Sequence, residues 1–183
     1  MTAPNWFIAL PVDPAGWFEA RVRDPPGGVR RFHPEDLHVT LAFFGPCGEA
    51  RATAAWEALT PPLPRTAVSL GAVVPMGPPS RWSALSAELV EGRDPVEAAM
   101  AAWRDLLCDL AGASREHRPP KAHVTLARPH RRASRDERDD ALRWARALDL
   151  RDVRVTLDRV ALVTWSEPGS PRRFCERASL ALT

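Results

Sequence analysis

The spacing of apolar and polar positions divides the chain into stretches that predict strands and helices. Alternation of apolar and polar residues, enriched in Val, Ile, Thr and aromatic residues, is typical of a strand with one buried face. Predicted strands cover residues 5–12, 37–44, 66–74, 82–89, 121–127, 153–166 and 173–182, the last two forming a hairpin. Ala-rich or helically spaced apolar stretches predict helices at residues 14–23, 49–59, 94–110 and 135–148.

The order of these elements predicts an internal duplication. Each half of the chain contains a strand with the same pentapeptide, followed by a helix and a hairpin, and the two pentapeptides begin at residues 38 and 123, 85 residues apart. This order favours an α+β fold in which two antiparallel sheets, flanked by helices, meet at a central cleft. Because no linker is long enough to separate independent domains, we expect one pseudo-symmetric, two-lobed domain over residues 1–183.

The composition is that of an ordinary globular protein. Hydrophobic residues make up 45% and charged residues 26% of the 183 positions, and the net charge is only +2. The three cysteines have no metal-like spacing and indicate reduced thiols in a cytoplasmic protein. No apolar stretch approaches the roughly 20 residues of a membrane helix. The apolar run at residues 6–12 is interpreted as a strand rather than a signal peptide, because Pro11 interrupts it.

The repeated pentapeptide is the main candidate for a site. It reads His-Val-Thr-Leu-Ala at residues 38–42 and again at residues 123–127. Because side chains alternate along a strand, the His and the Thr of each copy point to one face, and the Val and Leu point to the other. Two such strands side by side would bring His38, Thr40, His123 and Thr125 into one site. The alternative is that each His is a structural residue bonded to a neighbouring Thr.

Two imidazoles facing one site suit general acid–base catalysis. An unperturbed His has a pKa of about 6.5, so one can be neutral and the other protonated near neutral pH. Hydrolysis of a cyclic phosphodiester needs a base for water and an acid for the leaving ribose oxygen, and Thr hydroxyls can donate to the phosphate oxygens. This scheme requires no metal or other cofactor. The carboxylates near the motifs form no spaced ligand set.

The motifs and their flanks resemble the 2H phosphoesterases. The most similar branch is the RNA 2',3'-cyclic phosphodiesterases, often named 2'-5' RNA ligases. The resemblance covers residues 6–11, residues 37–45 with the closing Gly, residues 123–128 with the closing Arg, and the final hairpin. It implies the two-lobed fold of that family and hydrolysis of RNA 2',3'-cyclic phosphate ends to 2'-phosphates. It also implies that Arg128 contacts phosphate. The residues alone leave open which His is the acid, and the resemblance assigns His38 as acid and His123 as base.

Other residues near the motifs are candidates for substrate contacts. Phe43 stands where the second motif has Arg128, and its ring could pack in the core or stack on a base. Lys121 and Asp36 each precede a motif His by two residues. Alternation places both on the His face, Lys121 to contact phosphate or RNA and Asp36 to orient His38, unless they are solvated rim charges. His130 follows the second motif and could touch substrate, unless it is a solvated loop residue.

A basic stretch and one departure from the family also bear on the substrate. Arg30 and Arg31, with Arg131, Arg132 and Arg135, could guide an RNA backbone toward the cleft, although such charges are usually only solvated. The chain has no Tyr, and Phe174 stands where the family commonly has one in the last strand.

Three functions fit these features. The first is metal-independent hydrolysis of RNA or nucleotide 2',3'-cyclic phosphates. The second is the reverse reaction, 2'-5' RNA ligation by the same groups. The third is a non-catalytic RNA-end binding protein, against which the two intact histidines argue. We expect the protein to act as a monomer without a membrane partner.

Overall fold

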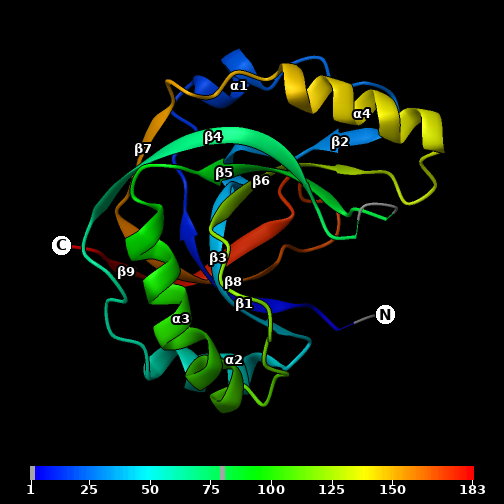
Figure 1. Cartoon of the computed structure of the whole chain (residues 1–183). Coiled ribbons are helices and arrows are strands. Elements are labelled where there is room, and N and C mark those ends of the chain that lie inside the picture. The colour runs from blue at the N-terminus through cyan, green and yellow to red at the C-terminus, as the bar shows by residue number, and fades with distance from the viewer. Residues whose placement is uncertain (1–2, 79–80) are drawn as a thin grey trace.

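The computed structural model describes residues 3–78 and 81–183 and contains two antiparallel sheets with helices around them (Figure 1). In the four-stranded sheet the neighbours are, in order, β3 (His38–Gly45), β1 (Trp6–Pro11), β8 (Arg159–Trp165) and β9 (Phe174–Ala181). In the five-stranded sheet they are β2 (Val29–Arg31), β6 (His123–Pro129), β5 (Ala84–Leu89), β4 (Thr66–Met76) and β7 (Arg154–Leu157). The predicted α+β fold with two antiparallel sheets is confirmed.

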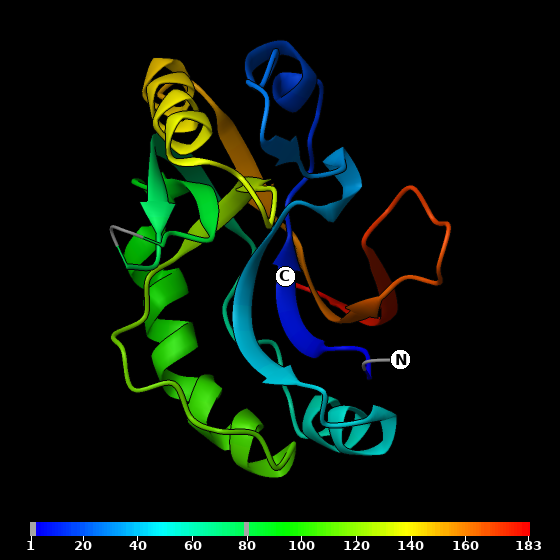
Figure 2. The ribbon, with the colours of Figure 1, turned by 90° about the vertical axis from the view of Figure 1, so that its right-hand side faces the viewer.

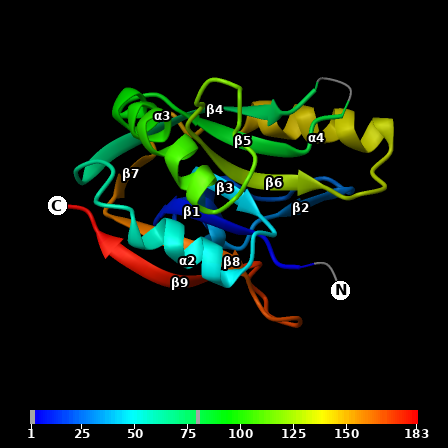
Figure 3. The same cartoon turned by 90° about the horizontal axis from the view of Figure 1, so that it is seen from below.

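The helices pack around the outside of the two sheets. They are α1 (Trp17–Arg21), α2 (Glu49–Glu57), α3 (Arg93–Leu110) and α4 (Arg135–Ala147), with a short 3₁₀ helix, η1 (Pro34–Asp36), before the first motif strand. Helix α3 lies along β3 and packs on α2 (Figure 2), and α4 packs against β4 and β2 of the five-stranded sheet (Figure 3). No helix within the described residues is long and apolar enough to cross a membrane.

Several predicted boundaries are wrong for identifiable reasons. The first helix begins at Trp17 rather than near residue 14, because Asp13 accepts a hydrogen bond from the Ala15 N–H in a tight turn instead of capping the helix. The predicted strand at residues 153–166 is two strands that join different sheets, β7 and β8, so the final hairpin consists of β8 and β9 alone. The short elements β2 and η1 were not predicted. Part of the connection between the predicted strands at residues 66–74 and 82–89 lies outside the described residues.

The apolar side of each motif strand anchors it in the core. Val39 and Leu41 of β3, and Val124 and Leu126 of β6, are at most 1% exposed. Burying each such side chain contributes roughly 1.5–3 kcal/mol relative to leaving it in water. These anchors fix the register of both strands, because a slip of one residue would turn the histidines into the core.

Strand β3 contains a β-bulge directly after the motif threonine. In its pairing with β1, Thr40 and Ala42 lie opposite neighbouring residues, so Leu41 is the extra residue. Leu41 and Ala42 are consequently both buried, in a strand where burial otherwise alternates up to that point. The bulge shifts the alternation by one position, and Phe43 therefore lies on the same face as Thr40.

Strand β6 repeats this bulge at the equivalent position. Thr125 and Ala127 lie opposite neighbouring residues of β5, and Leu126 is the extra residue. Strict alternation from His123 would place Arg128 on the face opposite the motif histidine. The strand continues to Pro129, and the bulge instead turns Arg128 to the face of Thr125.

Candidate active site

The two motif strands line one small cavity between the sheets. The cavity has a volume of about 190 Å³, and His38, Thr40, His123 and Thr125 all contribute to its wall. The sequence predicted that these four side chains would converge, and the structure brings them together. The cavity is smaller than the 300–1,000 Å³ typical of sites for whole small molecules, so it suits the reacting end of a larger substrate.

A larger cavity lies elsewhere and has different walls. It measures about 580 Å³ and lies between β4 and the C-terminal end of α4. Its lining is mostly apolar, and its carboxylate, Asp149, is paired with Arg151. Since its lining residues include no His, Cys, Ser or Thr, they offer no nucleophile or neutral acid–base pair.

Both motif histidines are held in the same way. Nδ1 of His38 donates to the carbonyl oxygen of Asp36 at 2.7 Å, and Nδ1 of His123 donates to the carbonyl oxygen of Lys121 at 2.7 Å. A carbonyl can only accept, so each Nδ1 carries a proton. In the neutral imidazole the other nitrogen, Nε2, therefore has a free lone pair. Each histidine thus keeps Nε2 for substrate, as a base when neutral and as an acid when protonated.

His38 lies among aromatic rings. Its ring centroid is 5.0 Å from that of Phe7 and 5.3 Å from that of Phe174, which meets it edge-on. Burial disfavours the charged imidazole and lowers the pKa of His38 from 6.5 to about 4, against the opposing effects of the Asp36 carbonyl and carboxylate. In the ligand-free protein His38 is therefore neutral at pH 7.

The surroundings of His123 are more polar. Burial again lowers the pKa of this imidazole, the cations Lys121 and Arg128 lower it further, and the Lys121 carbonyl and Glu88 raise it. Glu88 lies opposite His123 in the β5–β6 pairing and forms an ion pair with Lys121 at 2.7 Å. The two histidines thus share their geometry and differ in their electrostatic surroundings.

The two threonines also differ in their support. The hydroxyl of Thr125 lies 3.1 Å from the hydroxyl of Ser86, a fully buried residue on β5. Thr40 lies opposite Ala9 on β1, which offers no hydroxyl. Ser86 therefore orients only one of the two threonines, and sequence reasoning missed it because the residue sits in an otherwise ordinary strand.

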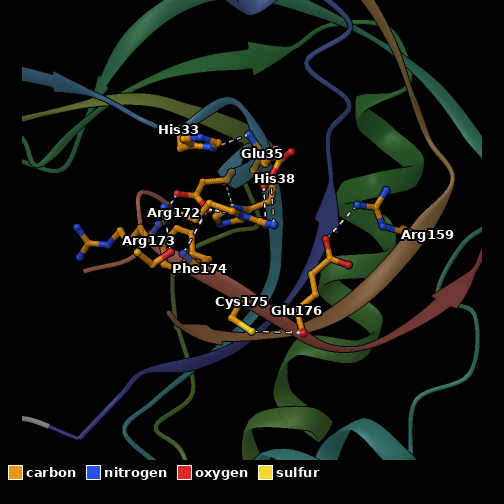
Figure 4. Close-up of polar contacts among 11 residues, drawn as sticks. His33, Glu35, His38, Arg159, Arg172, Arg173, Phe174, Cys175 and Glu176 are labelled. Carbon is orange, nitrogen blue, oxygen red and sulfur yellow. Dashed lines mark hydrogen bonds and ion pairs between the residues drawn. The ribbon is translucent and has the colours of Figure 1, made fainter. Parts of the chain in front are cut away.

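Asp36 supports the site through its main chain and its carboxylate. Its buried carboxylate accepts hydrogen bonds from the main-chain N–H groups of Arg173 at 2.7 Å and Phe174 at 3.2 Å. Arg172, Arg173 and Phe174 consequently lie beside His38 (Figure 4). The predicted role of Asp36 in orienting His38 is filled by its carbonyl oxygen. The alternative of a solvated rim charge is wrong, because Asp36 is only 3% exposed.

The remaining predicted site residues divide into two groups. Phe43 and Arg128 line the cavity, and Phe43 is 54% exposed, which excludes the alternative that its ring packs in the core. Lys121 and His130 are not part of the cavity wall. The Lys121 side chain turns to Glu88, and His130 lies in the exposed turn that precedes α4.

Sequence reasoning missed most of the other residues that line the cavity. They come from segments with no motif of their own, and only Phe174 had been noted, as the residue in place of a Tyr. Tertiary packing alone brings them to the site. The cavity wall also contains Asn5, Phe7, Phe32, Trp165, Arg173 and Phe174.

Within residues 3–78 and 81–183, no group of three or more His, Cys, Asp or Glu side chains is arranged to hold a metal ion. The chemistry that the residues themselves supply is acid–base catalysis by two imidazoles, with hydroxyl and guanidinium donors for an anion.

Among the comparisons with known proteins, the search of solved structures gave matches over the whole chain. A scan against protein-family models and a search of curated proteins found no match. Among solved structures, E. coli LigT complexed with NADP+ has 18% identity and a TM-score of 0.71, with 100% of this chain and 99% of that chain covered. A structure described as a phosphoesterase has 17% identity, a TM-score of 0.70 and 99% coverage of both chains. The protein TT0787 of Thermus thermophilus has 21% identity, a TM-score of 0.68 and 97% coverage of both. The chain therefore has the fold of E. coli LigT over its whole length, with the two antiparallel sheets and flanking helices that the sequence predicted.

Proposed function

We propose that the protein hydrolyses RNA 2',3'-cyclic phosphate ends to 2'-phosphates by two-histidine acid–base catalysis without a metal ion. One observation carries the proposal. Two His-x-Thr pairs face one cavity, and each imidazole is fixed through Nδ1 so that Nε2 is available to substrate. A structural role for the histidines would not require both of them to line the same cavity.

The reaction needs one proton taken and one proton given. The neutral histidine accepts a proton from water through Nε2 as the water oxygen forms a bond to phosphorus. The bond from phosphorus to the ribose 3' oxygen breaks, and the protonated histidine donates its Nε2 proton to that oxygen. Each of these roles is worth roughly 10²–10⁴ in rate. The product carries a 2'-phosphate, and the pair regains its starting state by exchanging one proton with solvent.

Thr40, Thr125 and Arg128 bind the phosphate in this scheme. The two hydroxyls donate to non-bridging oxygens, where negative charge gathers as phosphorus becomes five-coordinate. Arg128 adds a cation on the same face as Thr125, because the bulge in β6 turns it there. Phe43, exposed at the equivalent position of β3, offers a ring on which the base can stack.

The assignment of acid and base follows the resemblance, with His38 as acid and His123 as base. Burial holds the pKa of His38 at about 4 in the ligand-free protein, so this assignment requires that the bound phosphate raise it. An anion placed at Nε2 has that effect, because an opposite charge within a few ångströms favours the imidazolium form.

Known ligands of a structural neighbour support a nucleotide substrate. Structures of E. coli LigT have been solved with 3'-AMP, with ATP and with phosphate. Each of these ligands carries a phosphate group, as does the substrate proposed for this protein.

The test is turnover of a short RNA ending in a 2',3'-cyclic phosphate, in excess EDTA, with separation of 2'- and 3'-phosphate products. We expect turnover by the wild type and loss of at least 10²-fold in His38→Ala and in His123→Ala. Activity that disappears with EDTA would overturn the metal-independent mechanism. Joining of an added RNA 5'-hydroxyl in preference to hydrolysis would favour the ligase. Tight RNA binding without turnover would favour the binding protein.

A further inference from the structure

Three arginines from separate segments gather at the mouth of the catalytic cavity. They are Arg30 on β2, Arg128 on β6 and Arg173, which directly precedes β9. We propose that Arg173 and Arg30 bind a second phosphate of the substrate, the one attached to the 5' oxygen of the nucleotide that carries the cyclic phosphate, beside the reacting phosphate that Arg128 contacts. This inference rests on the proposed function and names its substrate class.

The structure places the three cations close together. Arg30 lies directly opposite Arg128 in the β2–β6 pairing, so both side chains project from the same face of the sheet. Arg128 and Arg173 both line the cavity. Burial lowers the pKa of each of these two guanidinium groups, and the neighbouring arginines lower it further. Like charges opposite one another are destabilising, and a bound anion removes that cost.

Ion pairing distinguishes these arginines from their sequence neighbours. Arg31 is paired with Glu19, and Arg172 is paired with Glu35. Among the residues that the structure describes, Arg30, Arg128 and Arg173 form no ion pair with a carboxylate. The nearby Asp36 carboxylate accepts instead from the main-chain N–H groups at the start of β9.

Aromatic rings hold two of the cations in place. The guanidinium carbon of Arg128 lies 5.6 Å from the ring centroid of Phe32. That of Arg173 lies 5.9 Å from Trp165 and 5.7 Å from Phe174. Cation–π contacts position a guanidinium without using its N–H donors. Nε of Arg128 is buried without a hydrogen-bond partner among the described residues, as expected of a donor that awaits an anion.

The size of the cavity places the second phosphate outside it. At about 190 Å³ the cavity accommodates the cyclic phosphate between the histidines and threonines, and the rest of the nucleotide must lie at the mouth. Arg30 and Arg173 are exposed there. The next phosphate along an RNA chain is one ribose away from the cyclic phosphate. A mononucleoside 2',3'-cyclic phosphate lacks it, so the site favours a 5'-phosphorylated nucleotide or the end of an RNA chain.

The experiment compares three substrates that differ only at the 5' oxygen. They are adenosine 2',3'-cyclic phosphate, the same compound with a 5'-phosphate, and the dinucleotide ApA with a 2',3'-cyclic end. We expect the wild type to have at least a fivefold lower KM for both phosphorylated substrates, a preference that shrinks as salt rises. A preference for the dinucleotide alone would identify the RNA backbone as the source of the phosphate, and a preference for the monophosphate alone a free 5'-phosphate.

Arg173→Gln is the test variant, and Arg177→Gln is its control. Arg177 is an exposed arginine on β9, the strand that follows Arg173, and it is paired with Glu49 outside the cavity wall. We expect the ratio of KM values that expresses the preference to fall to near one in Arg173→Gln and to keep its wild-type value in Arg177→Gln. Equal wild-type KM values for all three substrates would overturn the second phosphate site. So would an equal loss on all three in Arg173→Gln.

A binding measurement separates this inference from the proposed reaction. Calorimetry compares adenosine 2'-monophosphate with adenosine 2',5'-bisphosphate as ligands of the wild type and of Arg173→Gln. We expect the bisphosphate to bind at least fivefold more tightly to the wild type and to lose that advantage in the variant. If no cyclic phosphate is turned over, the proposed function fails while this result still decides the phosphate site. Equal affinity for the two ligands would overturn it.

Discussion

Phe43 and Arg128 occupy equivalent positions in the two motif strands, and each reaches the cavity between the sheets past a β-bulge at the preceding Leu-Ala pair. The two strands therefore share the same bulged backbone, but they present different side chains at this position. One strand offers a half-exposed aromatic ring and the other a guanidinium group. In the proposed function the reacting phosphate lies between the two His-x-Thr pairs. The difference between Phe43 and Arg128 then gives the cavity one side that binds a nucleobase and one side that binds an anion.

The exposed ring of Phe43 leads to the first prediction. Phe43→Ala should raise KM for the cyclic substrate about tenfold with little change in kcat, because stacking of a base on an aromatic ring is worth about 1–3 kcal/mol. The free energy of unfolding should change little, since the side chain is 54% exposed. Steady-state kinetics and urea denaturation measure the two effects. A fall in stability with KM unchanged would instead make Phe43 a packing residue.

The histidine pair leads to a prediction about pH. The active form of the pair is singly protonated in either assignment of acid and base. Its population is greatest between the pKa of His38, about 4, and that of His123, which is lowered from 6.5. We expect kcat/KM to peak between these values and to fall from pH 6.5 to 8, because both imidazoles are then neutral and no acid remains.

The pH profile of kcat should be shifted to higher pH than the profile of kcat/KM. The bound phosphate places a negative charge beside the imidazoles and raises the pKa of the protonated one. A kcat/KM that is still rising between pH 6.5 and 8 would contradict the lowered pKa values in the free protein.

The lowered pKa of His38 also predicts how stability depends on pH. The unfolded chain binds a proton at this residue below about pH 6.5, whereas the folded protein binds it only below about pH 4. The unfolded state therefore holds more protons in this window, and stability falls as pH is lowered through it, by up to about 3 kcal/mol. His38→Asn should lose less free energy of unfolding between pH 6.5 and 4 than the wild type does.

Urea denaturation at several pH values measures this difference. The matched control is His117→Asn, which replaces an exposed imidazole and should leave the wild-type slope unchanged. The same slope in His38→Asn as in the wild type would show that the titration of His38 does not destabilise the folded protein.

The sequence predicted the fold and the four motif residues for one physical reason. Alternating polarity along a strand indicates which side chains are buried and which face the other way. Because the same pattern occurs in both motif strands, the four polar side chains could be placed in one site, namely His38, Thr40, His123 and Thr125. Alternation failed at Arg128, because a β-bulge shifts the period, and only the consecutive buried residues Leu126 and Ala127 signal it.

The rest of the cavity depends on tertiary packing that no local pattern shows. Phe7 belongs to a strand whose apolar sequence predicts only core packing. Arg173 lines the cavity, whereas the adjacent Arg172 forms an ion pair with Glu35. The carboxylate of Asp36 decides between them by fixing the backbone at the start of β9. Lys121 was expected near the phosphate from alternation, but an ion pair with Glu88 holds its side chain aside.

That ion pair leads to a prediction for Lys121. Lys121→Met should change kcat/KM less than about threefold, because the exposed pair with Glu88 is worth little and the carbonyl that fixes His123 is part of the main chain. Ser86→Ala, by contrast, removes the buried hydroxyl that orients Thr125 and should lower kcat by about three- to tenfold. Kinetics of both variants on one cyclic substrate make the comparison. A larger loss in Lys121→Met than in Ser86→Ala would place Lys121 at the phosphate after all.

Asp36 connects the stability of the fold to the site, and its substitution gives the last prediction. Asp36→Asn replaces one of the two accepting carboxylate oxygens with an NH2 group, which cannot accept, so the main-chain N–H of Arg173 or of Phe174 loses its partner. The free energy of unfolding should fall by about 1–3 kcal/mol. Because Phe174 packs edge-on against His38, kcat/KM should fall as well.

The control is Glu35→Gln, which removes only the exposed partner of Arg172. Urea denaturation and kinetics on the same cyclic substrate test both effects, and equal stability of the two variants would mean that the carboxylate does not hold the start of β9.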